Sequence, residues 1–301
     1  MGTAAGGGFP QWNCNCRVCC VARSNPARAR PRTQSGVAIS ADASHWFLLN
    51  ASPDLLAQIH SFPPLAAHLD TIRNSPIQGV LLTNGDLDHT LGLALLREGE
   101  ALAVYSTSRV REALTEGLAL LPLLKRYCGL TWHDCILNPF ELHHRNGTPS
   151  GLLVKAIDIP GSAPKYHATP TRCAFGDSVA YIITDTRSGG ILVFAPDVSI
   201  PTPELVDALK RADVVLYDGT FWSEHDMSES GAGTALAADM GHQPISGPGG
   251  SLDILAALPT PHRVYMHINN TNPILLEDSP ERQQVADRGI EVGEDGMEFE
   301  L

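Results

Sequence analysis

The chain has 301 residues, a hydrophobic content of 43% and a formal net charge of −12 at pH 7, so it can bury a large core as one large domain or two small ones. Only 21 Lys and Arg stand against 33 Asp and Glu, which argues against a nucleic-acid surface, because phosphates are bound by clustered cations. No apolar run approaches the roughly 18 residues of a membrane span, and no charged segment followed by an apolar one opens the sequence. We therefore expect a cytoplasmic protein without a membrane segment.

Four of the seven cysteines crowd near the start of the sequence, at positions 14, 16, 19 and 20. A secreted disulfide framework spreads its cysteines along the chain, whereas thiols at this spacing reach one tetrahedral ion without closing long loops. We interpret Cys14, Cys16 and Cys19 as ligands of a structural zinc(II), within a cysteine-rich loop over residues 14–20. Cys20 follows Cys19 too closely to be an easy fourth ligand, so that ligand is expected from elsewhere in the fold. The alternative is a packed turn of reduced cysteines.

Apolar runs and turn residues predict the elements in chain order. Residues 36–40 and 46–50 form a hairpin, 53–69 a helix broken by Pro63-Pro64, 77–82 a buried strand, 91–97 a short helix, 101–105 a strand and 108–121 a helix. Short strands with Gly and Pro turns follow over 132–181. Strands at 190–195, 214–217 and 263–266 then alternate with helices at 202–211 and 251–257. The sequence thus predicts two series of strand and helix units.

The stretch 83–90, Thr-Asn-Gly-Asp-Leu-Asp-His-Thr, follows a predicted buried strand and precedes a predicted short helix. It places two carboxylates, an amide and an imidazole within six residues. In an extended loop residues two apart face the same way, so Asn84, Asp86 and Asp88 can point into one cavity with His89 beside them. Metal ligands converge in this way. The alternative is an acidic solvated turn in which Asp88 or Thr90 caps the next helix.

Four apolar strands each end in a group that can bind a metal. The strand at 77–82 leads to Asp86, Asp88 and His89, and the strands at 190–195, 214–217 and 263–266 lead to Asp197, Asp218 and His267, respectively. In sheets built from strand and helix units, ligands collect at the carboxyl ends of the strands, so these groups are expected to meet. A lone Asp after a strand is more often a helix cap or a turn. Four such endings, together with His242, favour a metal site.

The order of these motifs resembles that of the metallo-β-lactamase superfamily, whose central motif is T-H-x-H-x-D-H. Residues 83–89 are TNGDLDH, with Asn84 and Asp86 where the superfamily has histidines. Asp197 matches its bridging aspartate and His267 its late histidine, while its middle histidine has no match near residues 159–164. The resemblance implies an α/β fold, a four-layer αββα sandwich, as a single domain over residues 1–301. The altered ligands argue against a hydrolytic two-zinc centre.

A narrower resemblance, over nearly the whole chain, is to the PQQ biosynthesis protein B (PqqB) family. Five blocks carry it: residues 4–16, 83–93, 218–222, 240–245 and 267–273. It implies a role in pyrroloquinoline quinone (PQQ) biosynthesis as an iron-dependent hydroxylase, an oxidoreductase that uses molecular oxygen on the tyrosine ring of a glutamate-tyrosine intermediate. Other proteins of the PQQ pathway are possible partners. Cys20 is an extra thiol beside the three that the family has.

The donor atoms agree with this implied iron(II) cofactor, because an amide and a carboxylate in place of two histidines suit iron(II) better than paired zinc. His89, His267 and one carboxylate would form a two-histidine, one-carboxylate set with positions open for oxygen and substrate. Asp86, Asp88 and Asp197 compete for the carboxylate role.

His242 lies outside this ligand set. In relatives with this fold a histidine at such a place handles protons, which implies acid or base work for His242 beside Asp218. The alternative is a histidine that merely packs at a helix end.

Two other functions stay open. One is a zinc-dependent hydrolase of phosphodiester or lactone type, which the parent fold favours and the missing histidines oppose. The other is a noncatalytic carrier involved in PQQ transport, in which the altered motif is a decayed metal site. Metal content separates the three: iron near one per chain for the hydroxylase, two zincs beyond the cysteine site for the hydrolase, and none for the carrier.

Overall fold

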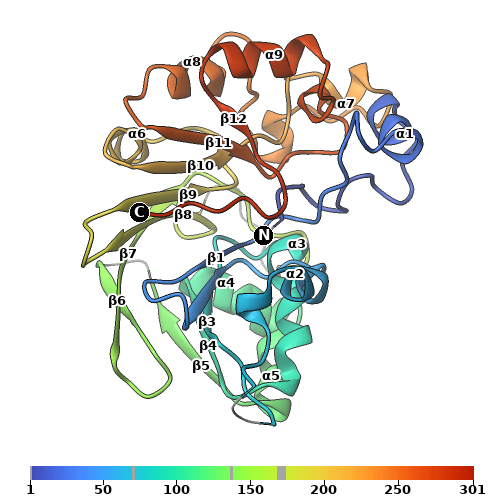
Figure 1. The fold of residues 1–301 in the computed structure, drawn as a ribbon. Coiled ribbons are helices and arrows are strands. Elements are labelled where there is room, and N and C mark those ends of the chain that lie inside the picture. Colours follow the sequence, from blue (N-terminus) through green and yellow to red (C-terminus); the bar gives the residue numbers. More distant parts are fainter. Residues whose placement is uncertain (1, 70–71, 136–137, 168–173) are drawn as a thin grey trace. The chain divides into compact units, whose positions relative to one another are not determined.

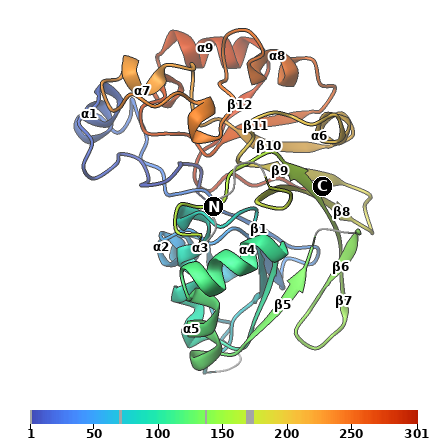
Figure 2. The same ribbon diagram turned by 180° about the vertical axis from the view of Figure 1, so that it is seen from behind.

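The computed structural model describes residues 2–69, 72–135, 138–167 and 174–301. They fall into two compact units, each shown from two sides in Figures 1 and 2: unit 1 contains residues 36–191 and Leu301, and unit 2 contains residues 2–35 and 192–300. None of the helices in the described ranges is long and apolar enough to cross a membrane.

Unit 1 is built on a five-stranded sheet. Its strands, in spatial order, are β1 (Val37–Ile39), β2 (Trp46–Leu49), β3 (Ile77–Leu81), β4 (Leu102–Ser106) and β5 (Leu130–Asp134). β1 and β2 form the predicted hairpin, and the other neighbours pair in parallel, with Val80 opposite both Leu48 and Val104. The predicted strands at 77–82 and 101–105 are therefore confirmed, and their parallel pairing brings their carboxyl ends to one edge.

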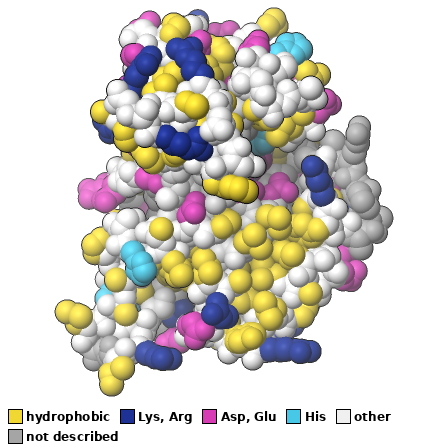
Figure 3. Space-filling view, turned by 90° about the vertical axis from the view of Figure 1, so that its right-hand side faces the viewer, with side chains coloured by type: hydrophobic (Ala, Val, Ile, Leu, Met, Phe, Trp, Pro, Cys, Tyr) yellow, Lys and Arg dark blue, Asp and Glu magenta, His cyan; other side chains and the backbone are white. Residues whose placement is uncertain are grey.

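Helices of unit 1 bury apolar side chains against this sheet. They are α2 (Leu55–Ser61), η1 (Pro63–Leu65), α3 (Leu87–Thr90), η2 (Leu91–Glu98), α4 (Ser108–Glu112), the π-helical turn η3 (Ala113–Gly117) and α5 (Leu120–Tyr127). Leu55, Leu93 and Leu124 from three of them are fully buried in one core with strand residues. Other apolar side chains on these helices stay exposed, among them Leu123 and Tyr127, and Figure 3 shows hydrophobic side chains gathering on the face of this unit.

The continuous helix predicted over 108–121 is wrong. Thr107 caps α4 by accepting a hydrogen bond from the Val110 amide, but the helix then widens into η3, and Ala119 adopts a left-handed backbone with φ 55° before α5 begins. Gly117 lies at this break and is packed against another segment, since a Cβ there would lie 2.5 Å from the Tyr166 carbonyl oxygen. Tertiary packing thus overrides helix propensity at this point.

Three antiparallel strands complete unit 1: β6 (Phe140–His143), β7 (Pro149–Ile159) and β8 (Ser178–Asp185). They confirm the short strands expected in 132–181, of which 136–137 and 168–173 lie outside the described residues. The buried Tyr181 hydroxyl of β8 donates to the Leu82 carbonyl at 2.7 Å, and Asn84 bridges to Ser178. β8 therefore supports the loop that follows β3.

Unit 2 contains four parallel neighbours, β9 (Ile191–Ala195), β10 (Val214–Asp218), β11 (His262–Met266) and β12 (Glu291–Val292). Its helices are α1 (Arg17–Ser24), α6 (Pro203–Leu209), α7 (Asp226–Glu229), η4 (Ala238–Met240), α8 (Ser251–Ala256), η5 (Pro273–Leu275) and α9 (Pro280–Asp287). Residues near the start of the chain join this unit, because Ala4 forms parallel bridges to Gln34 and Ile268. The predicted strands at 190–195, 214–217 and 263–266 and both predicted helices are confirmed.

Sequence reasoning missed α1, α9 and β12. In α9 only Val285 is buried, so apolar periodicity gives no signal. A local signal was nevertheless present, because Ser279 accepts a hydrogen bond from the Arg282 amide and Pro280 occupies the first helical turn, the arrangement typical of a helix start.

Candidate functional site

The loop after β3 is shorter than the sequence predicts. Helix α3 begins at Leu87, with Asp86 as its N-cap residue in extended backbone, so Asp88 and His89 lie on a helical turn. The expectation of an extended segment in which Asn84, Asp86 and Asp88 alternate along one face is therefore wrong beyond Asp86. No capping side-chain hydrogen bond is formed by Asp86 itself. The short helix predicted at 91–97 is η2, and Thr90 is its N-cap residue, although its side chain forms no capping hydrogen bond. Asp88 lies inside α3 and is not the N-cap residue of η2.

Helix α3 is held tightly against the end of β2. The Ala51 amide donates to the His89 carbonyl at 2.7 Å, and the Gly92 amide donates to the Ala51 carbonyl at 2.9 Å. A Cβ at Gly92 would lie 2.2 Å from the Ser52 carbonyl oxygen, so only glycine permits this approach. The turn that carries His89 consequently has a fixed position within unit 1.

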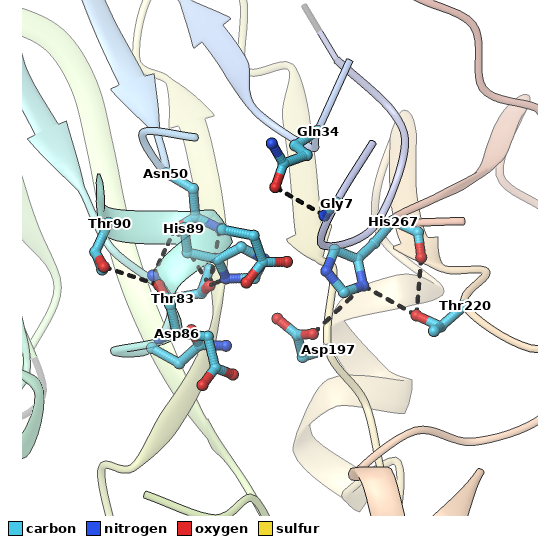
Figure 4. A network of polar contacts seen from close by, with 12 residues as sticks. Gly7, Gln34, Asn50, Thr83, Asp86, His89, Thr90, Asp197, Thr220 and His267 are labelled. Carbon is cyan, nitrogen blue, oxygen red and sulfur yellow. Dashed lines mark hydrogen bonds and ion pairs between the residues drawn. The ribbon is translucent and has the colours of Figure 1, made fainter. Parts of the chain in front are cut away.

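Asn50, Thr83 and His89 form a buried hydrogen-bonded cluster, here called the His89 cluster. Thr83 Oγ1 lies 3.2 Å from His89 Nδ1, Asn50 Nδ2 donates to Thr83 Oγ1 at 2.9 Å, and the Thr83 amide donates to Asn50 Oδ1 at 2.9 Å. Figure 4 shows the three side chains pointing toward one another. Asp88 Oδ2 lies 3.8 Å from His89 Nε2. The cluster thus fixes one side of the His89 ring and leaves a carboxylate at the other.

The two other polar residues of the motif organise the loop. Asn84 is buried and its Oδ1 accepts from the Asp86 amide at 3.0 Å, while Asp86 is exposed. The Tyr166 hydroxyl donates to the Gly85 carbonyl. Burial and the nearby Asp86 charge both raise the pKa of Tyr166, so its phenol remains a donor.

The carboxyl ends of β9, β10 and β11 bring distant residues of unit 2 together. Tyr217 pairs with both Ala195 and Tyr265, and Asp218 pairs with Met266. Because the three strands are parallel and in register, the groups that follow them meet at one edge. Asp197 Oδ1 lies 3.5 Å from His267 Nδ1 and 3.9 Å from His242 Nδ1.

We call Asp197, Asp218, Thr220, His242 and His267 the His267 cluster. Asp197, His242 and His267 each offer a ligand atom, and these three atoms lie within 4.8 Å of one another. The rings of His242 and His267 have centroids 5.4 Å apart. The structure therefore brings His242 into a group with two residues from which sequence reasoning had separated it.

Thr220 joins the members of this cluster, as Figure 4 shows for His267. Its Oγ1 lies 2.9 Å from His267 Nδ1, 2.8 Å from the His267 carbonyl oxygen and 2.6 Å from Asp218 Oδ1. His267 itself has φ 55°, a left-handed backbone that is unusual for a residue other than glycine. Its backbone and ring are thus both held by one hydroxyl group.

Asp218 is completely buried and orients His242. Its Oδ2 lies 2.8 Å from His242 Nδ1 and accepts from the Val198 amide at 2.8 Å, and its Oδ1 accepts from the Thr220 amide at 2.9 Å. Burial opposes the charge on each partner, but their mutual attraction prevails, lowering the pKa of Asp218 and raising the pKa of His242. His242 therefore keeps its proton to a higher pH than an ordinary histidine.

Cys14, Cys16 and Cys19 lie together at the start of α1, with their sulfur atoms within 4.8 Å of one another. Cys16 is the N-cap residue, and its Sγ accepts from the Cys19 amide at 3.5 Å. The hydrogen bond from the Cys19 thiol, against the effect of burial, lowers the pKa of Cys16 to about 5. Three convergent sulfurs, one readily ionised, fit a tetrahedral zinc ion.

A residue that is distant in the sequence reaches these thiols as a hydrogen-bond donor, while the fourth zinc ligand expected from elsewhere in the fold remains a prediction. Asn270, in the loop after β11, places its Nδ2 3.3 Å from Cys19 Sγ and 3.8 Å from Cys16 Sγ. Cys20 is exposed, and its Sγ lies 3.3 Å from the Asn15 carbonyl oxygen. It therefore points away from the trio.

Sequence reasoning found the charged and imidazole groups but missed the neutral residues that position them, namely Asn50, Thr83, Thr220 and Asn270. A signal existed for two of them. Thr220 follows Asp218 by two residues directly after a buried strand, and Asn50 closes another buried strand. A short polar residue at the end of a buried strand is thus worth testing as a positioning group.

Comparisons with known proteins match this chain to a domain family and to individual full-length proteins. Residues 45–268 match the model of the beta-lactamase superfamily domain. The coenzyme PQQ synthesis protein B of Methylobacillus flagellatus (strain ATCC 51484) is 42% identical over 305 aligned positions, which cover all of this chain and 98% of that protein. The protein of the same name from Azotobacter vinelandii is also 42% identical, with the same coverage.

Solved structures agree with the sequence relatives. The crystal structure of Zn²⁺-bound PqqB from Methylobacterium extorquens superposes with a TM-score of 0.90 at 38% identity, covering all of this chain and 98% of that one. A diphosphatase of the PhnP family superposes with a TM-score of 0.66 at 18% identity over all of this chain and 94% of that one, a likeness of fold alone. The predicted metallo-β-lactamase fold is confirmed.

Proposed function

The chain belongs to the coenzyme PQQ synthesis protein B family, and we propose that its part in PQQ biosynthesis is an iron-dependent hydroxylation of the tyrosine ring of a glutamate-tyrosine intermediate. One observation supports this above all: Asp197, His242 and His267 present three ligand atoms within 4.8 Å of one another. Non-haem iron(II) oxygenases hold their metal with two imidazoles and a carboxylate and leave positions open. Of this group, Asp197 and His267 are assigned as a carboxylate and an imidazole ligand, His242 is assigned as a neighbour that handles protons, and the second imidazole is left to the sequence prediction for His89.

Within this proposal, Asp197 and His267 hold the iron. The Thr220 hydroxyl lies 2.9 Å from His267 Nδ1 and fixes the ring, as partners of metal-binding histidines do. The sequence expectation that His89 supplies a further imidazole, and Asp86 or Asp88 a further carboxylate, remains a prediction.

His242 is assigned the handling of protons. Its Nδ1 is held by the buried Asp218 at 2.8 Å, so the opposite ring nitrogen has a defined direction, as a general acid or base requires. A carboxylate also orients metal-binding histidines, which makes the metal content of a His242 variant the deciding measurement.

The reaction balances with one external reductant. Bound iron(II) supplies the activation of molecular oxygen. Each turnover converts one aryl C–H bond, one O₂, two electrons and two protons into an aryl C–OH group and water. The protein must therefore deliver protons beside a bound phenol, which is the task given to His242 and Asp218.

The test is a paired measurement on protein purified without oxygen. Iron and zinc are counted, and the protein is then given oxygen, a reductant and a glutamate-tyrosine dipeptide while mass spectrometry follows the product. We expect a gain of one oxygen atom per step. His242→Ala should keep its iron and lose about 10²-fold in turnover, while His225→Ala, a change at an exposed histidine of the same unit, should keep both.

Each other outcome points to another function. No mass gain with iron supplied, together with tight binding of the finished quinone, supports the carrier. Two zincs beyond the cysteine site support the hydrolase. Loss of iron in His242→Ala makes His242 a ligand and withdraws its acid or base role.

We also propose a structural zinc(II) at Cys14, Cys16 and Cys19. The convergence of the three sulfurs supports it, since three thiols this close together can bind one tetrahedral ion. The PqqB structure from Methylobacterium extorquens is described as Zn²⁺-bound.

A further inference from the structure

We propose that unit 1 carries a separate surface site for a divalent cation of the zinc type, formed by Asp42, His45 and His144. Each of these residues offers one ligand atom, and the three atoms lie within 4.8 Å of one another. Two imidazoles and a carboxylate are a common ligand set for Zn²⁺, which takes a fourth ligand from water where the site is open. Asp42 and His45 are exposed, so water can reach this position.

The hairpin loop between β1 and β2 places two of the ligands. Asp42 Oδ1 accepts from the Ser44 amide at 2.9 Å and from the His45 amide at 2.8 Å, while Asp42 Oδ2 lies 2.8 Å from His45 Nδ1. Ala43 between them adopts a left-handed backbone with φ 58°. The loop is therefore closed on the carboxylate, and the His45 ring is already beside it.

The third ligand comes from the turn between β6 and β7. The His144 amide donates to the Thr148 carbonyl at 2.9 Å, and the Gly147 amide donates back to the His144 carbonyl at 2.8 Å. The next residue, Arg145, ties the turn to the amino end of β3 through Gln78 Oε1 at 3.0 Å. The His144 ring then lies with its centroid 4.4 Å from that of His45. Both parts of the site are thus ordered by their own backbone bonds, which lowers the entropy cost of binding.

The Nδ1 atom of His144 indicates that a ligand is missing. This atom is shielded from solvent and has no hydrogen-bond partner among the residues that the structure describes. A buried polar atom left in this state costs about 1–3 kcal/mol. A hydrogen bond between Asp42 and His45 alone explains a stable loop, but it does not explain why the half-buried ring of His144 is brought against them. A bound cation explains all three positions.

Zinc in this site would join two hairpins that are distant in the sequence, because Asp42 and His45 belong to the first and His144 to the second. A ligand that binds the folded state and not the unfolded state stabilises the fold, so added Zn²⁺ should raise the melting temperature. All three ligands lie outside the His89 and His267 clusters, so we expect turnover to be unaffected by the site.

The experiment counts zinc on the full-length chain whose tight metal sites are already filled. Parent, His144→Gln, His45→Gln and His143→Gln are dialysed against the same micromolar free Zn²⁺, and bound zinc is measured per chain. His143 is the matched control, since it is exposed, neighbours His144 and has its Nδ1 3.0 Å from the Glu141 carbonyl oxygen. We expect the parent and His143→Gln to bind one equivalent more than the other two variants.

The same four proteins are melted with and without Zn²⁺. A zinc-dependent rise in melting temperature should occur in the parent and in His143→Gln and be absent from His144→Gln and His45→Gln. Equal zinc counts and equal shifts in all four proteins overturn the proposal. If His144→Gln fails to fold, His45→Gln decides, because the His45 side chain is 45% exposed and its replacement leaves the core intact.

Discussion

The loop after β3 and the strand edge of unit 2 present similar side chains by opposite routes. In unit 1, the polar residues are contiguous from Asn84 to His89, and helix α3 begins among them. In unit 2, Asp197, Asp218 and His267 are far apart in the sequence and meet because β9, β10 and β11 are parallel and in register. The first arrangement depends on local backbone geometry, and the second on the whole sheet.

This difference governs how each site responds to change. A contiguous motif can be altered at one residue while the sheet that carries it remains intact. A distributed group is linked through buried polar atoms, so that removing one member leaves several partners unsatisfied. The variants below test this contrast, beginning with the largest expected loss of stability.

Cys16→Ser tests the cysteine site, whose ligands are close together in the sequence. Here the bound metal should supply most of the free energy that stabilises the site. We expect loss of the zinc and a decrease of about 5 kcal/mol in the free energy of unfolding, because binding energy of about 10–16 kcal/mol in small zinc peptides is folding energy. Zinc content and urea unfolding measure this. Cys20→Ala, at the exposed thiol, should keep both zinc and stability. A parent without tightly held zinc and a Cys16→Ser variant that melts like it would contradict the assignment.

Asp218→Ala tests the His267 cluster, whose members are far apart in the sequence. It removes the partner of His242 and of two buried amides, so we expect a loss of about 3–4 kcal/mol in the free energy of unfolding, as for other broken buried charge pairs. Turnover should fall as well. Asp207→Ala, at a side chain that is 69% exposed, is the control and should change stability by less than about 0.5 kcal/mol. Equal effects of the two changes would mean that Asp218 does not organise the cluster.

Thr83→Val tests whether the hydrogen bonds of the His89 cluster contribute as much to stability as those of the His267 cluster. The change keeps the side-chain shape but removes the hydroxyl that contacts both Asn50 and His89, so we expect a loss of about 1–2 kcal/mol in the free energy of unfolding. Thr131→Val, at an exposed threonine of β5, is the matched control for chemical denaturation. A loss as large as that of Asp218→Ala would remove the contrast between the two regions.

Asn84→His combined with Asp86→His should have the smallest effect on stability, about 1 kcal/mol, because Asp86 is exposed and a hydrogen bond such as the one at 3.0 Å from the Asp86 amide to Asn84 is worth about that much. Its effect should be on metal preference. More nitrogen donors favour zinc, so we expect greater zinc uptake, less selective iron binding and loss of hydroxylation. Metal analysis and product mass spectra measure these changes. An unchanged iron-to-zinc ratio would show that residues 84 and 86 do not face the metal.

Much of this could be predicted from the sequence because strand ends are visible in it. The apolar runs ending before Asp197, Asp218 and His267 placed those groups at one sheet edge without any structural information. The place of His242 beside Asp218 was expected from the family resemblance and not from the strand pattern, since His242 follows a long loop; its Nδ1 lies 2.8 Å from Asp218 Oδ2.

Local geometry within the β3 loop was harder to predict. The alternation expected for Asn84, Asp86 and Asp88 assumes extended backbone, whereas the close packing of Gly92 on the Ser52 carbonyl draws the chain into a helical turn from Leu87. That contact joins residues forty positions apart in the chain (92 − 52). A motif in one short segment therefore identified the residues but not the directions of their side chains.

The left-handed backbone of His267 sets a limit on how this protein can be optimised. With φ at 55°, a residue with a side chain pays roughly 1–2 kcal/mol that glycine does not. Glycine would relieve this backbone cost, but it would also remove the buried ring that contacts Thr220 and Asp197. Position 267 thus sets backbone strain against the buried polar contacts of its imidazole, and a library at this position selected for thermal stability alone would measure which of the two is larger.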